Sequence, residues 1–197
     1  MSKIISLNKG LLAVFAAGFF TVVHYASVVY INSSTIEKYV GPNSTNLLYS
    51  VGSILSIFLL ILAPFLIHKF GSKKAFLIFI LLEIVATLSL GFSVSPILVA
   101  IFFILHHSGQ STLNFFMDIN VEEKIQKESE TGRTRGALLT VQNVGWVLSP
   151  LLIPLLQNEN SLKNIYIAST LVLIPLSLLV AFAFKNFSAN LKVQDFE

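Results

Sequence analysis

Hydrophobic residues fall into six long runs along the chain, separated by short segments that are rich in polar and charged residues. The hydrocarbon core of a bilayer is about 30 Å thick, so a helix needs about 20 mostly apolar residues to cross it. Membrane strands would instead appear as short segments of alternating polarity. The pattern therefore predicts an all-α membrane protein with six transmembrane helices, over residues 11–31, 47–67, 75–94, 97–119, 136–156 and 165–184.

Composition supports this class. Of the 197 residues, 54% are hydrophobic and 12% are charged, which excludes a disordered chain and a nucleic-acid-binding module and argues against a soluble enzyme. The absence of Cys excludes disulfides and thiolate metal sites. The first run is longer than the apolar core of a typical signal peptide, so we interpret it as a retained span.

The positive charges predict the orientation, because Lys and Arg near span ends are retained on the cytoplasmic side. Of the 13 Lys and Arg residues, only Lys38 and Lys163 fall on one side of the six spans. Both termini are therefore expected in the cytoplasm, with the bundle in the plasma (inner) membrane. The cytoplasmic set is Lys3, Lys9, Lys69, Lys73, Lys74, Lys124, Lys127, Arg133, Arg135, Lys185 and Lys192.

The same pattern predicts one six-span domain over residues 1–197. It consists of a cytoplasmic N-terminus (1–10), a membrane bundle (11–184) and a cytoplasmic tail (185–197). A long charged connection over residues 120–135 is expected to divide the bundle into two groups of three spans.

The turn after the second run, residues 68–74, reads HKFGSKK. With Leu66 before it, this turn resembles the loop signature that joins spans two and three in the major facilitator superfamily. His68 stands where that family usually has an acid, and Pro64 stands where it usually has Gly. We expect Asp118, at the cytoplasmic end of the fourth run, to serve in place of the acid. The resemblance implies a cytoplasmic gate made of Lys69, Gly71, Lys73, Lys74, Asp118, Arg133 and Arg135.

The fifth run carries a second match. Gly136, Gly145, Ser149 and Pro150 resemble the Gly-rich fifth-span signature of the family's antiporters, although its closing Gly pair is replaced by Ile153-Pro154. Small residues let helices approach closely, and Pro removes a backbone donor. We therefore expect a hinge at Gly136, Gly145 and Pro150.

The resemblance covers nearly the whole chain and implies the amino-terminal half of a family member. Its six transmembrane helices would form two inverted three-helix repeats, half of a major facilitator fold, with the substrate cavity between two halves. Half a cavity cannot alternate its access. The expected partners are the lipid bilayer, a small-molecule solute and a second six-span half, which is another copy, a separate carboxy-terminal half or a further part of a longer protein; no nucleic acid is expected.

The fourth run carries the most polar side chains. At 100° per residue, His107, Ser111, Asn114 and Asp118 form one stripe, with Gln110 beside it. This stripe is either a wall of the substrate pathway or a seam of interhelical hydrogen bonds. Because His titrates near neutral pH, His107 is also a candidate proton site.

Two other runs offer candidate pathway residues. His24, with Tyr25 beside it, is either a substrate contact or a histidine tucked against a neighbouring helix. Gln142 lies on a stripe with Trp146 and Ser149, which serves packing, substrate contact or both.

Glu83 is the one formal charge well inside a run, and a charge at that depth is costly. It is either a proton-coupling site or the partner of a structural hydrogen bond to Ser50, Ser53 or Ser56 of the second run. His106 and His107 have no carboxylate nearby in the sequence, so no metal site and no cofactor are expected.

These observations predict a half-length secondary active transporter of a small solute that works by alternating access, with proton-coupled antiport as its mode of coupling. The alternative is a membrane scaffold or sensor subunit that keeps the half-fold without transporting. We expect no enzyme, because Ser108 has Gly on one side only and its neighbouring histidines point in different directions along a helix.

Overall fold

The structure, a computed structural model, describes residues 9–125, 128–157 and 162–185. Within these residues the chain forms six α-helices, and the short 3-10 helices Pro42–Ser44 and Glu128–Glu130 precede the second and the fifth. All six are long and apolar enough to cross a bilayer, which confirms the predicted six-helix class. The helices are α1 (Lys9–Tyr39), α2 (Thr45–Phe70), α3 (Ser72–Phe92), α4 (Pro96–Lys124), α5 (Thr131–Leu156) and α6 (Lys163–Ala183).

Several helices extend beyond their apolar runs. The first continues to Tyr39, eight residues beyond the predicted end at Ile31, because helical hydrogen bonding carries on through a polar segment at the membrane edge. The predicted long connection over residues 120–135 is wrong for the same reason. Most of it is helical, since α4 runs to Lys124 and α5 begins at Thr131. Lys3 and Lys192 of the predicted termini and the connection residue Lys127 lie outside the described residues, whereas Lys9, predicted in the cytoplasmic N-terminus, begins α1.

The predicted turn between the second and third spans is a single residue. Gly71 has φ 81° and ψ 154°, a backbone conformation that favours glycine. Its N–H donates to the Ile67 carbonyl at 2.8 Å and so caps α2, and its own carbonyl accepts from Ala75 N–H at 3.1 Å in the first turn of α3. A glycine at this position is what allows the reversal to be so tight.

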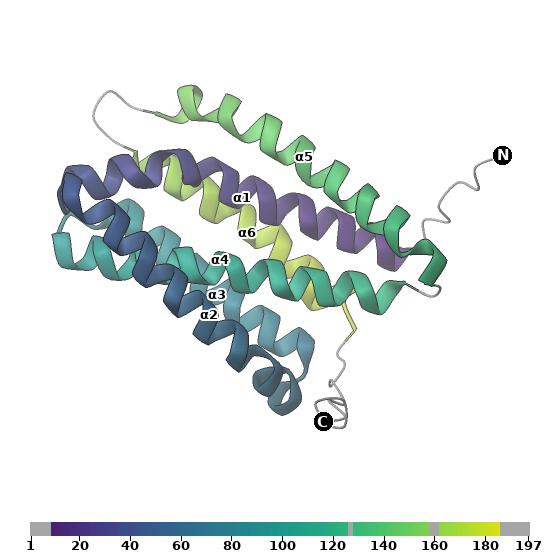
Figure 1. The fold of residues 1–197 in the computed structure, drawn as a ribbon. Helices are drawn as coiled ribbons and strands as arrows, with labels where there is room; N and C mark the ends of the chain where they lie inside the picture. The colour runs from purple at the N-terminus through teal and green to yellow at the C-terminus, as the bar shows by residue number, and fades with distance from the viewer. Residues whose placement is uncertain (1–8, 126–127, 158–161, 186–197) are drawn as a thin grey trace.

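The contacts between helices stay nearly the same when α1 is exchanged with α4, α2 with α5 and α3 with α6, so the two halves of the bundle repeat one arrangement. The first helix packs against α5 and α6, and the fourth packs in the same way against α2 and α3; α1 with α4 and α3 with α6 are the other extensive contacts (Figure 1). Because each repeat has three helices, the second starts from the opposite face of the membrane and is inverted. The described helices thus form two inverted three-helix repeats.

The interior has three layers along the bundle. One buried apolar cluster contains Val14, Phe76 and Phe116, and the other contains Val28 and Val99. Between them lies a layer of buried polar side chains on α1, α3, α4 and α6, which includes His24, Thr87, His106 and Ser169. Hydrophobic burial therefore holds both ends of the bundle, while hydrogen bonds hold its middle.

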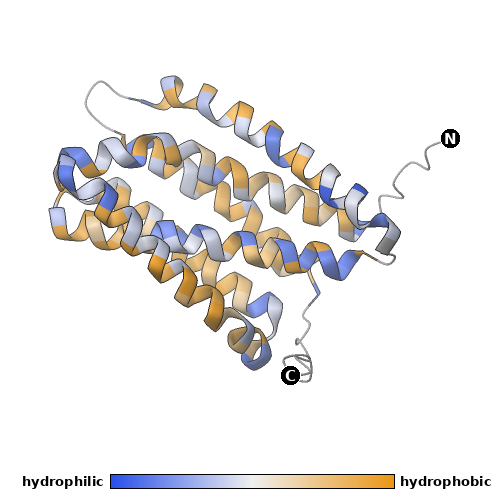
Figure 2. Ribbon diagram, viewed as in Figure 1, coloured by the Kyte–Doolittle hydropathy of each residue, from blue (hydrophilic) through white to orange (hydrophobic). Residues whose placement is uncertain are grey.

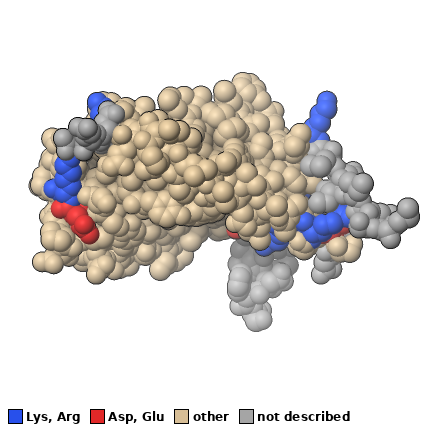
Figure 3. Space-filling model, turned by 90° about the horizontal axis from the view of Figure 1, so that it is seen from above, with Lys and Arg blue, Asp and Glu red and all other residues tan. Residues whose placement is uncertain are grey.

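The surface matches a bilayer. Lys, Arg, Asp and Glu gather at the two ends of the bundle in Figure 3, and an uncharged band lies between them. In Figure 2 the hydrophilic positions in the membrane-depth region lie along α4 and α5, on the face that also shows α1 and α2. Few residues of α2 and α5 are buried although both helices are apolar. Lipid or another protein must therefore cover them.

Helix α5 meets α1 at Gly145, where a Cβ would lie 3.1 Å from Val22 Cγ1 and 3.3 Å from Val23 Cγ2. We predict that Gly145→Leu will overpack this contact and lower the free energy of unfolding by about 1–3 kcal/mol. The matched control is Gly136→Leu on the same helix, where a Cβ meets open space. Unfolding in detergent micelles measures both, and equal stability of the two variants would contradict the packing described.

Candidate functional site

A polar surface lies on the exposed face of α4, which we call the open face of the bundle. Asn114 and Asp118 are exposed and His107 and Ser111 are half-buried, so the predicted stripe faces outward from the six-helix bundle. His107 Nε2 lies 3.3 Å from Ser53 Oγ of α2, and the imidazole sits edge-on to the Tyr49 ring at 5.2 Å. We call His107, Ser111, Asn114 and Asp118 the polar wall.

The position of His107 depends on a glycine that sequence reasoning missed. A Cβ on Gly52 would lie 2.8 Å from His107 Cδ2. The small residue lets α2 approach α4 at the depth of the imidazole and leaves the ring no space toward α2. Without a homologue comparison, an isolated Gly in an apolar run carries no signal of this role.

Residues of α1 and α5 extend this polar surface beyond the polar wall itself. The Trp146 ring meets Tyr25 edge-on at 5.8 Å and Tyr30 at 6.3 Å, which joins these two helices through aromatic contacts. Tyr30 is 57% exposed, and Tyr25 and Gln142 are half-buried. Side chains able to form hydrogen bonds thus lie on α1 and α5 as well as on α4.

Two predicted pathway residues are not on this face. His24 is 0% exposed and Gln110 is 4% exposed, so neither lines the open surface. The reason for His24 is its angular position on α1, which directs the imidazole into the bundle between α3 and α6. The structure therefore gives the tucked alternative for His24.

The buried charge Glu83 lies at the centre of the polar layer and is 1% exposed. Its Oε1 lies 2.5 Å from His106 Nδ1 and 3.0 Å from His24 Nε2, and it also accepts from Thr87 Oγ1 at 3.3 Å. His24 in turn reaches α6, where Ser169 Oγ lies 2.8 Å from Nδ1. We call His24, Glu83 and His106 the buried cluster; with Ser169 it connects α1, α3, α4 and α6.

The expected hydrogen bond from Glu83 to Ser50, Ser53 or Ser56 is wrong. These hydroxyls belong to α2, and two of them donate to carbonyls of their own helix: Ser50 to Asn46 and Ser56 to Gly52. The sequence did not reveal the histidine partners, because His24 is 59 residues away and His106 is 23 residues away. The Glu83–Thr87 pair, one turn apart on α3, was the available local signal.

His24, Glu83 and His106 bring three metal-binding side chains together, although no metal site was expected. Their ligand atoms all lie within 4.8 Å of one another. Two ligands bound to one ion at about 2.0–2.1 Å each usually stand about 3 Å or more apart. The 2.5 Å between His106 Nδ1 and Glu83 Oε1 is a hydrogen-bond distance, and the described arrangement is a hydrogen-bonded network.

The buried cluster has two proton arrangements that keep every heavy atom in place. In one, Ser169 Oγ–H donates to His24 Nδ1, and Nε2–H donates to Glu83. In the other, Ser169 Oγ–H donates to the His24 carbonyl at 2.8 Å, and Nδ1–H donates to the Ser169 carbonyl at 3.1 Å. In the second arrangement Nε2–H still donates to Glu83, so His24 carries one more proton than in the first, and the Ser169 hydroxyl has rotated. This arrangement can therefore accept and release a proton.

The predicted gate residues lie at the end of the bundle where α2 meets α3 and α4 meets α5. Arg135 pairs with Glu122, an acid that sequence reasoning missed, and this ion pair joins α5 to α4. Lys69 and Lys74 are exposed beside Gly71. The predicted gate residues thus contribute their charges to one end of the bundle.

The predicted hinge residues behave differently from one another. Gly145 lies against α1, and Ser149 Oγ, one turn later, approaches the Val23 carbonyl at 3.3 Å. Gly136 faces open space, so no close contact forms there among the described residues. Helix α5 runs without interruption through Pro150.

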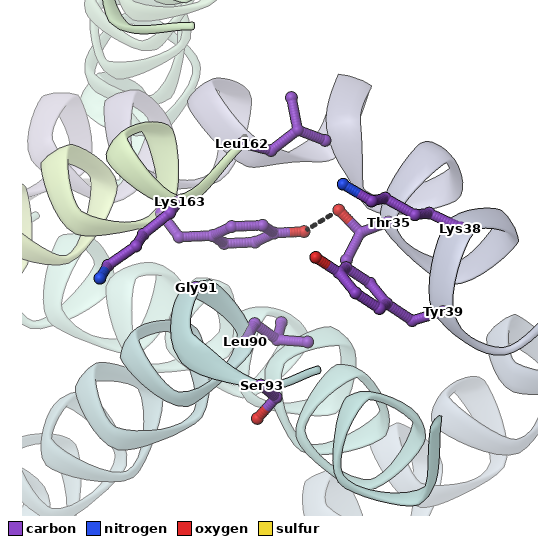
Figure 4. Close-up of a pocket in the computed structure, with 9 residues that line it drawn as sticks. Thr35, Lys38, Tyr39, Leu90, Gly91, Ser93, Leu162 and Lys163 are labelled. Carbon is purple, nitrogen blue, oxygen red and sulfur yellow. Dashed lines mark hydrogen bonds between the residues drawn. The ribbon is translucent and has the colours of Figure 1, made fainter. Parts of the chain in front are cut away.

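A small pocket lies at the opposite end of the bundle (Figure 4). Tyr166 Oη lies 3.0 Å from Thr35 Oγ1, drawn as the dashed line, and 2.9 Å from Asn32 Oδ1. Lys38 and Lys163 border this pocket, so the two lysines that were assigned to one side of the membrane do lie at the same end.

Six membrane-length helices in two inverted repeats, with a polar wall and a buried ionisable cluster, define a polytopic α-helical membrane protein. The family model of the Major Facilitator Superfamily matches residues 11–195, and the chain belongs to this family of membrane transporters. The fold is that of a six-span half of the family's architecture. No curated protein matches the chain.

We predict that Glu83→Ala will lower the free energy of unfolding by about 3–5 kcal/mol, because it leaves His24 and His106 buried without their acceptor. The matched control is Glu37→Ala, which removes an exposed acid from α1 and should change stability by under about 1 kcal/mol. Unfolding in detergent micelles measures both. If the two variants are equally stable, the buried cluster does not hold the bundle.

Proposed function

We propose that this protein is a secondary active transporter of a small solute that works by alternating access, with its polar wall facing a second six-span half. The second half is another copy, a separate carboxy-terminal half or a further part of a longer protein. The observation that carries the proposal is the polar wall itself, because polar side chains at membrane depth are costly unless they meet water, solute or protein. In this proposal the bundle lies in the plasma (inner) membrane, with both termini in the cytoplasm.

The position of the polar wall supports a partner on that face. Asn114 is exposed at the membrane-depth face of α4, whereas the outward face of α3 carries Ile78, Leu81 and Leu82. Apolar side chains suit lipid, and the amide does not. Helices α2 and α5 flank the polar wall and are the least buried of the six spans, so they supply the contact surface for the second half.

Proton coupling rests on the buried cluster and not on the wall alone. The two hydrogen-bond arrangements of His24 and Ser169 differ by one proton, and Glu83 balances the added charge. The buried cluster lies inside the bundle and includes His24 of α1 and His106 of α4. The same two helices carry Tyr25 and His107, which lie at the open face. Solute on the wall and a proton in the cluster would therefore act on the same two helices, which suits proton-coupled antiport.

The alternative is a scaffold or sensor subunit whose polar wall binds a partner protein and moves no solute. The two functions differ in one result: His107→Ala would weaken assembly in the scaffold and flux in the transporter.

We predict that the polar wall is reached from water. The natural chain has no Cys, so a single introduced Cys is the one thiol that a maleimide can label. Asn114→Cys should react with a membrane-impermeant maleimide in vesicles. Ile78→Cys, at an apolar position of α3 that is 45% exposed, should not react. Equal reaction at both positions, or reaction at Ile78→Cys alone, would contradict a pathway at the wall.

We predict that proteoliposomes containing the chain, with its second half where that half is a separate chain, will take up a solute from a panel of small metabolites and drugs. Uptake should change the lumenal pH, read with an enclosed dye. His107→Ala should reduce the uptake rate several-fold, as expected for loss of a hydrogen bond worth roughly 1 kcal/mol. The matched control is Ile101→Ala, at an exposed apolar position of α4. Absence of uptake across the panel would argue for the scaffold.

A further inference from the structure

We propose that the side of the bundle carries a binding pocket for a small amphipathic amine, with an apolar body and an amino head that reaches Glu83. The pocket lies between α2, α3 and α4 and has a volume of about 180 Å³. It is separate from the polar wall and does not depend on transport. It differs from the wall in chemistry, since nearly all of its lining is apolar.

The outer part of the pocket suits the apolar body. Leu82, Val85 and Leu105 line it, and each is about half exposed on the outer surface of the bundle. A ligand can therefore arrive from the apolar surface that lipid covers. An apolar cavity of about 150 Å³ is enough to hold benzene, so this pocket has room for one aromatic ring with a short substituent.

The inner end of the pocket is polar. Glu83 and Ser108 line it, and Ser108 Oγ already donates to the Leu105 carbonyl at 3.0 Å. Glu83 uses only Oε1 for His24, His106 and Thr87. Its Oε2 is buried and has no hydrogen-bond partner among the described residues. A buried carboxylate oxygen without a donor costs free energy, so a donor from a ligand would be stabilising there.

Gly109 lets Glu83 Oε2 lie directly against α4 at the inner end of the pocket. A Cβ at this position would collide with Oε2, so any other residue would displace the carboxylate. Glycine in the middle of α4 otherwise costs about 1 kcal/mol in helix propensity. The carboxylate and the missing side chain together form the head-group end of the pocket.

An amine fits this end better than a purely apolar molecule. An ammonium or amino group supplies the N–H that Oε2 lacks, and charge-assisted hydrogen bonds to carboxylates are the strong ones. A molecule of the same shape without the donor leaves Oε2 unpaired. The expected difference is roughly tenfold or more in affinity.

The test uses the full chain in lipid nanodiscs and fluorine NMR of 4-fluorobenzylamine and 4-fluorotoluene, with empty nanodiscs to subtract partitioning into lipid. The amine should show saturable binding to the protein, at least about tenfold tighter than the toluene. Equal binding of the two would overturn the amine site and indicate an acyl-chain crevice, and absence of saturable amine binding would overturn the pocket.

Variants locate the site. Val85→Trp fills the mouth without touching the buried cluster and should abolish saturable binding, while Leu88→Trp, on the same helix but outside the pocket, should leave it unchanged. Glu83→Gln should bring the affinity for the amine close to that for the toluene. Since Glu83→Gln also changes the buried cluster, the Val85 and Leu88 pair decides the location if that variant fails to fold. Equal amine binding by Val85→Trp and Leu88→Trp would overturn the proposed location of the binding site.

Discussion

A carboxylate in the middle of a bilayer needs donors, and the interior of this bundle is arranged around that requirement for Glu83. His24 and His106 approach the same oxygen, and Ser169 extends the network to α6. Four helices contribute to one hydrogen-bonded layer, with apolar clusters on either side of it. Because direct contacts replace water in this layer, the relative positions of α1, α3, α4 and α6 follow from the network.

Adjacent residues of α4 serve two environments. His106 points inward to Glu83, and His107 lies half-buried at the open face beside Ser53. Two neighbouring imidazoles thus link the buried cluster to the polar wall through one helix. A change of charge in the buried cluster would alter the hydrogen bonds that hold α4, the helix that carries the polar wall. In the proposed function this is the physical basis for coupling a proton to a solute. In the same helix, Gly109 lets Glu83 Oε2 lie against α4 at the inner end of the side pocket.

The sequence predicted the six spans and the turn at Gly71, because apolar length and glycine are local signals. It also placed His107 and Asn114 on one stripe of the fourth helix, but left open whether that stripe faces a pathway or a neighbouring helix. It did not predict the partners of Glu83, since helix rotation and contacts between distant segments decide which histidine faces the acid. The depth of His24 and Gln110 was missed for the same reason, and helix ends were missed where polar residues such as Thr131 continue a helix.

The contact between His24 and Glu83 can be measured directly with a double-mutant cycle of His24→Ala and Glu83→Ala, using the free energy of unfolding of the full chain in detergent micelles. Residues that share one network couple by about 0.5–3 kcal/mol. A coupling of at least about 1 kcal/mol is expected here, because either single change removes a buried hydrogen bond of the other group. Effects that add to within about 0.5 kcal/mol would show that these two side chains do not hold the helices together.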